Sequence, residues 1–244
     1  MKKNLFKKCL FFIVIVSLLM VVISIMIKYD VEGEKVLPYS ISKILLVSTV
    51  DGQVNDDPEN IWNIGITQVN DIYVYIDKTM ETNETNETIK QVRLENFVIT
   101  NQPQKGKIKL LRPTGELNNL YTYSQQDYLS EGITYTGETI DDLKSLEISN
   151  SGGVLGFRIS LEELGTFISN EDIEITYDGK LLSNLGVKIE EIKFDMNFDI
   201  IITTSDDVNY KGTLTLNLPI DTVIEEGSSN KELTDFENIV FKRV

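Results

Sequence analysis

The stretch "IKFDMNFDIII", residues 192–202, decides the fold of this chain. Apolar side chains occupy every second position from Ile192 to Ile202, and mostly polar ones lie between them. A period of two predicts a β-strand with one apolar face and one mostly polar face. Turn-forming residues follow in "TSDDVN" (204–209), and three leucines then alternate with polar residues until Pro219. The sequence therefore predicts a long antiparallel hairpin over residues 192–218.

Similar alternation recurs along the chain. Further strand-like segments, separated by turn signals, cover residues 43–50, 72–76, 92–99, 108–110, 155–159 and 173–177. The apolar phase changes within 92–99, which predicts a β-bulge near Glu95 and Asn96. Residues 139–146 and 160–167 each begin with a capping residue and an acid three positions later, which favours one or two helical turns. The predicted fold is mostly β, an antiparallel β-sandwich-like domain with minor short helices.

The amino-terminal region has a different character. Residues 9–27 form an apolar run of 19 residues without a charge. As a helix rising about 1.5 Å per residue, this run would be roughly 28 Å long, close to the hydrocarbon thickness of a bilayer. A secretory signal has a shorter apolar run, followed by small residues at its cleavage site, and Ile25 to Tyr29 include none. We therefore predict a retained single transmembrane helix, so that the chain binds the membrane through residues 9–27.

Charges flanking this run predict its orientation. Lys2, Lys3, Lys7 and Lys8 precede it, whereas acidic residues follow soon after Lys28. The positive-inside rule then keeps the amino terminus in the cytoplasm and places the remainder outside the cell membrane. The absence of a disulfide framework and the richness in Ile, Asn, Lys and Glu indicate a bacterial cell envelope.

These features predict the division of the chain. The expected parts are a cytoplasmic segment (1–8), the anchor (9–27), a juxtamembrane stalk (28–42), a β-rich domain (43–222) and a tail (223–244). "SNSGG" makes residues 149–153 a candidate subdomain boundary. Ile239, Val240 and Phe241 suggest that the tail adds an edge strand.

Charge and residue types exclude several functions. The first 27 residues hold four lysines and no acids, which leaves 19 basic and 38 acidic residues for 28–244, a net charge of −19. Such a domain would repel nucleic acid. The chain has no histidine, which excludes Ser-His-Asp and Cys-His catalysis, and its one cysteine, Cys9, lies at the cytoplasmic edge of the anchor. We expect a binding or scaffolding protein with an envelope protein or a glycan as its partner. The alternative is a hydrolase that cleaves cell-wall or peptide substrates with carboxylates.

Two segments carry candidate binding residues. The first contains Tyr121, Tyr123, Tyr128 and Tyr135 among Ser, Thr and Gln residues, a composition typical of protein or glycan contact surfaces. The second, residues 51–60, gathers five oxygen-bearing side chains that could bind calcium: Asp51, Asn55, Asp56, Asp57 and Glu59. Its glycine is not where an EF-hand requires it, so this would be a calcium loop of another kind. No other cofactor is expected.

Overall fold

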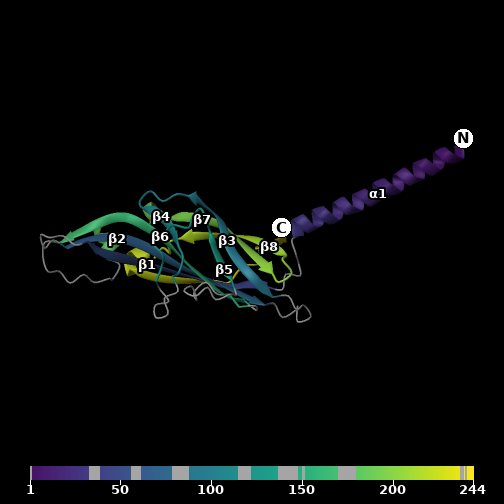
Figure 1. The fold of residues 1–244 in the computed structure, drawn as a ribbon. Helices are drawn as coiled ribbons and strands as arrows, with labels where there is room; N and C mark the ends of the chain where they lie inside the picture. Colours follow the sequence, from purple (N-terminus) through teal and green to yellow (C-terminus); the bar gives the residue numbers. More distant parts are fainter. Residues whose placement is uncertain are drawn as a thin grey trace.

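The structure is a computed structural model. It describes residues 2–32, 39–55, 62–78, 88–114, 122–136, 148–149, 152–169, 180–236, 239 and 241–244. Helix α1 (Lys2–Glu32) contains the uncharged stretch Leu10–Ile27, which is long and apolar enough to cross a membrane. None of this stretch is buried, and its large apolar side chains are 42–68 % exposed. Figure 1 shows α1 extending away from the strands.

All the described strands belong to two five-stranded antiparallel sheets (Figure 1). Sheet A has the strand order β4-β6-β2-β1-β9 and sheet B the order β10-β8-β7-β3-β5. The strands are β1 (Tyr39–Asn55), β2 (Trp62–Lys78), β3 (Ile89–Asn101), β4 (Lys107–Leu111), β5 (Ile133–Thr136), β6 (Gly152–Ser169), β7 (Phe194–Thr204), β8 (Asn209–Leu218), β9 (Ser228–Leu233) and β10 (Lys242–Arg243). Three short helices complete the described elements: α2 (Lys180–Asn184), α3 (Ile189–Ile192) and α4 (Val223–Glu226). The predicted mostly β fold with short helices is therefore confirmed.

The predicted hairpin is present as β7 and β8. Phe194 pairs with Leu218 and Phe198 with Leu214, so the apolar residues of both strands share one face. That face is buried against sheet A. The other face of β7 is less exposed than its polar sequence suggests, because Asp199 and Thr203 are also buried.

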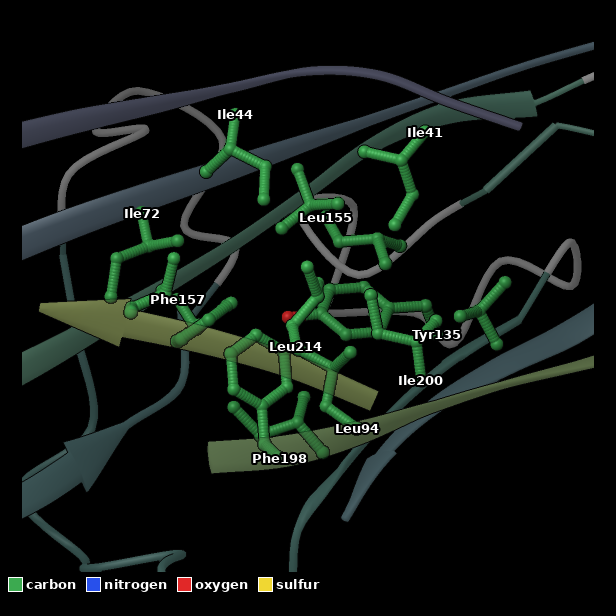
Figure 2. Close-up of a cluster of buried hydrophobic side chains, with 14 of the residues drawn as sticks. Ile41, Ile44, Ile72, Leu94, Tyr135, Leu155, Phe157, Phe198, Ile200 and Leu214 are labelled. Atoms are coloured by element: carbon green, nitrogen blue, oxygen red, sulfur yellow. The ribbon is translucent and has the colours of Figure 1, made fainter. Parts of the chain in front are cut away.

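Side chains from both sheets form one hydrophobic core (Figure 2). At its centre the Phe198 ring of β7 stacks on Phe97 of β3, with centroids 5.2 Å apart, and meets Phe157 of β6 edge-on at 5.6 Å. Sheet A extends beyond this core, where a second cluster joins Ile64, Ile66 and Leu161 to residues of α2 and α3. The long strands of sheet A are thus supported on one face along most of their length.

Of two irregularities in the strands, one was predicted from the sequence and the other was mistaken for a helical turn. The predicted bulge in β3 is present: pairing with β7 shifts between Glu95 and Val98, and Asn96 has a φ of 56°. The helical turn predicted at 160–167 is wrong, because these residues lie within β6. Here β6 bulges between Leu161 and Gly165, so Leu161 and Leu164 both enter the second cluster. Apolar residues three apart therefore imitate a helical pattern. The turn predicted at 139–146 lies outside the described residues.

The structure also moves the predicted domain limits. β1 begins at Tyr39, and the buried side chains of Tyr39 and Ile41 belong to the core rather than to a stalk. Helix α1 continues through Glu32. The candidate boundary at 149–153 does not separate two subdomains, because each sheet contains strands from both sides of it. The tail contributes β9 at the edge of sheet A and β10 at the edge of sheet B.

Candidate functional site

A pocket of about 960 Å³ lies on the outer face of sheet A. Alternation along β6 defines this face: Phe157 and Ile159 are in the core, so Arg158 and Ser160 point to the opposite side. The pocket is lined by Asp51 and Gln53 of β1, Thr67 and Val69 of β2, Lys109 and Leu111 of β4, several residues of β6, and residues 122–125. We call it the outer-face pocket.

One lining residue, Arg158, forms an ion pair between two neighbouring strands. Arg158 of β6 and Asp71 of β2 occupy the same register position. The Arg158 Nε and Nη2 groups donate hydrogen bonds to the two carboxylate oxygens of Asp71 at 2.7 and 2.8 Å. Burial alone would lower the pKa of Arg158, but the hydrogen bonds and charge of Asp71 raise it above its usual value. This bidentate geometry fixes the guanidinium plane against the sheet.

The Tyr123 side chain covers this ion pair. The centroid of its ring lies 4.1 Å from the Arg158 guanidinium carbon, which is a cation–π contact. Burial raises the pKa of Tyr123 first, and the nearby Asp71 charge and a hydrogen bond with Tyr73 of β2 raise it further. The hydroxyl therefore stays protonated, and the ring forms a fixed part of the pocket wall.

Backbone pairing beyond β4 positions Tyr123. Pro113 and Tyr123 form an antiparallel bridge, the Ser124 amide donates to the Arg112 carbonyl at 2.8 Å, and the Thr114 amide donates to Thr122 at 2.9 Å. The segment carrying Tyr123 thus runs beside the end of sheet A. One wall of the pocket is consequently a strand-like extension of the sheet.

Most of the other charges on the pocket walls are also paired. Lys109 lies 2.6 Å from Glu162, and Glu163 lies 2.7 Å from Lys107. Asp51 is exposed at the rim. The remaining polar side chains include hydroxyl and amide groups, so the lining is polar with its described charges mostly compensated.

The four candidate tyrosines do not form one surface. Tyr135 is fully buried and its hydroxyl donates to the Gly156 carbonyl at 2.9 Å. Tyr128 is buried in the core, with Arg112 over its ring. These two side chains pack in the interior rather than on an exposed surface. Tyr123 lines the outer-face pocket, and Tyr121 lies outside the described residues.

The candidate calcium residues are described only in part. Asp51 and Asn55 belong to β1, whereas Asp56, Asp57 and Glu59 lie outside the described residues. Within the part of the chain that the structure describes, no group of three or more acidic or cysteine side chains is placed to hold a metal ion. Calcium binding by residues 51–60 stays a prediction.

Sequence reasoning missed Arg158, Asp71 and Lys109. Arg158 is the one charged residue within 152–161, and that isolation in an apolar strand was the available signal. Its partner could not be found locally because Asp71 belongs to a strand far away in the sequence. Comparison with known proteins finds no matching family model, curated protein or solved structure. The site is therefore interpreted from its own geometry.

Proposed function

We propose that this chain is a single-pass protein of the bacterial cell membrane, whose exported β domain binds or scaffolds an envelope component through the outer-face pocket. The observation that carries the proposal is that one chain combines an unburied apolar helix, Leu10–Ile27, with a β domain that has a polar pocket. A helix of this length with its apolar side chains exposed is stable in a bilayer and costly in water.

The flanking charges support the orientation. Four lysines lie within the first eight residues, on the amino-terminal side of the apolar stretch. Only two lysines, Lys28 and Lys35, lie among the first fifteen residues after it. A cytoplasmic amino terminus and an extracytoplasmic β domain fit this asymmetry.

Pocket chemistry favours binding over hydrolysis. Carboxylate hydrolases need one acid that holds its proton near neutral pH and a second that is ionised. In the pocket, Glu162 forms an ion pair with Lys109 and Glu163 forms one with Lys107, so both carboxylates are already engaged by a side chain of the protein. The hydrolase alternative therefore has less support from the described residues than binding has.

Topology is tested in wall-stripped cells that express the full chain. Protease added outside should digest the β domain, and the protected fragment should begin at the original amino terminus. Replacing Lys2, Lys3, Lys7 and Lys8 by glutamine should produce a mixture of orientations, because the charge bias is lost. A mature chain that begins near Tyr29, or a β domain protected in intact cells, would contradict the anchored topology.

Binding is tested with the full chain in nanodiscs and a total envelope extract. Gln125 and Thr166 line the pocket and are exposed, so Gln125→Arg with Thr166→Arg should block it without changing the fold. Thr215→Arg, at an exposed position of β8, is the matched control. We expect retention of envelope material by the wild type and the control, and at least tenfold less by the pocket variant. Equal retention by all three would exclude the pocket as the binding surface.

A further inference from the structure

We infer that the ligand of the outer-face pocket is a neutral, hydroxyl-rich glycan strand. This inference rests on the proposed binding function and adds the chemical class of the ligand. It is carried by three features of the pocket: compensated charges, side chains that both donate and accept hydrogen bonds, and an immobilised aromatic ring.

Compensated charges disfavour a charged ligand. The Arg158 guanidinium is bound by Asp71 through two hydrogen bonds, and Lys109 lies 2.6 Å from Glu162. An anionic ligand would have to compete with these carboxylates for the two cations. It would also approach a chain with a net charge of −15. A cationic ligand would face the same competition for Glu162 and Glu163, and would find only Asp51, at the rim, as a lining carboxylate without an ion pair among the described residues.

The neutral polar side chains match hydroxyl groups. Gln53, Gln125, Thr67 and Thr166 line the pocket, and each carries both a donor and an acceptor. Sugar hydroxyls likewise donate and accept, so one face of a glycan satisfies such a lining without needing a charge. Three of them lie close together on sheet A, because Gln53 and Thr166 both pair with Gly65 and Thr67 is two positions further along β2. Gln125 comes from the 122–125 segment.

The Tyr123 ring supplies an apolar surface in a fixed position. Arg158 lies over the ring, and the backbone bridge to Pro113 holds the residue in place. A sugar ring presents C–H groups that pack against an aromatic side chain, while its hydroxyls reach the polar groups around it. Preorganisation of the wall lowers the entropic cost of binding.

The size of the pocket fits several sugar units. Ligand pockets commonly measure roughly 300–1,000 Å³, and this one is about 960 Å³. A volume near the upper end favours an oligosaccharide segment over a single sugar. A polymer strand lying across sheet A would use the pocket along its length.

The test compares hexasaccharides of equal length and different charge, with the full chain in nanodiscs and isothermal titration calorimetry. Maltohexaose and hexa-N-acetylchitohexaose are neutral, the chitosan hexamer is cationic and hexagalacturonate is anionic. We expect at least one neutral hexasaccharide to bind at least tenfold more tightly than both charged ones. An uncharged hexapeptide of glycine and serine serves as the protein-like probe and should not bind.

Pocket variants localise the binding. Gln125→Ala with Thr166→Ala should weaken binding of the neutral hexasaccharide about tenfold, because two hydrogen-bonding side chains are lost. Thr215→Ala, on β8, should leave the affinity unchanged. The inference is overturned if neither neutral glycan binds at millimolar concentration, if a charged hexamer or the peptide binds more tightly, or if the pocket variant binds like the wild type. If envelope material is still lost with the Gln125→Arg and Thr166→Arg variant while no neutral glycan binds, the binding function stands and the glycan assignment falls.

Discussion

Asp71 and Arg158 stand opposite each other on β2 and β6 and form a bidentate ion pair, with side chains only 11 % and 20 % exposed. Removing one member of such a pair leaves a nearly buried charge without compensation. Arg158→Met is therefore expected to destabilise the β domain by about 3–5 kcal/mol.

Replacing both members tests whether the loss comes from the unpaired charge. Asp71→Leu combined with Arg158→Met removes both charges, and most of the lost stability should return. Urea unfolding of the full chain in detergent, followed by circular dichroism, gives the free energy of unfolding for each variant. A double variant as unstable as Arg158→Met alone would show that the arginine acts through packing on Tyr123 instead.

Phe198 is expected to be among the most sensitive core positions. Its ring contacts Phe97 and Phe157, which come from different sheets, so Phe198→Ala opens a cavity between them. We expect a loss of about 3–5 kcal/mol. Thr215→Ala, on the exposed face of the partner strand, should change the free energy of unfolding by no more than about 0.5 kcal/mol. Similar losses in the two variants would mean that the faces of the β7–β8 hairpin are assigned wrongly.

Asp199 should make stability depend on acid pH. Burial alone would raise its pKa, but hydrogen bonds from Lys211, Thr213 and Asn96 lower the pKa below its usual value. In the unfolded chain an aspartate has a pKa of about 3.9. A lower pKa in the folded state means that the contribution is complete well above pH 4 and is lost as the pH falls through the folded value.

Asp199→Asn isolates this contribution. The difference in free energy of unfolding between wild type and variant should be constant near neutral pH and should shrink below about pH 4. Thermal melts in matched buffers from pH 7 to pH 2 measure it. A difference that stays constant over the whole range would show that the Asp199 carboxylate does not have a lowered pKa.

Calcium binding by residues 51–60 is the remaining prediction from the sequence. If residues 51–60 bind it, millimolar calcium should raise the melting temperature, because the ion binds the folded state preferentially. Asp56→Asn with Asp57→Asn should abolish the increase, and a chelator should reverse it in the wild type. If calcium leaves the melting temperature unchanged, residues 51–60 do not form a calcium site.

The hairpin could be predicted because its information is local. Alternation in 192–202 defines both faces of β7, and the turn residues that follow determine where β8 begins. The bulge at Asn96 was likewise visible as a change of phase within one strand. By contrast, the bulge in β6 placed Leu161 and Leu164 on one side, which a local reading interprets as a helix.

The site was harder to predict because strand register determines it. Tyr135 faces the core since it pairs with Val92, which is itself buried, and nothing in the tyrosine segment specifies that partner. Likewise, Arg158 contacts Asp71 because the register of β2 and β6 places the two residues opposite each other. Residue types near Tyr123 did indicate a polar surface, but only the pairing of long strands places Lys109, Arg158 and Gln53 in the same pocket as Tyr123.

The position of β9 has a consequence for the order of events during synthesis. β1 is the first strand to be made, yet one of its edges is covered by β9, with Ile44 pairing to Leu233. Until that late segment emerges, the stretch of β1 from Ile44 to Thr49 keeps unpaired backbone groups along one side, which other chains can use for pairing. Such a distant pairing also closes slowly. A cell making this protein would therefore need to protect an open strand edge through most of translation, and shortening the chain before residue 228 should turn a foldable domain into an aggregating one.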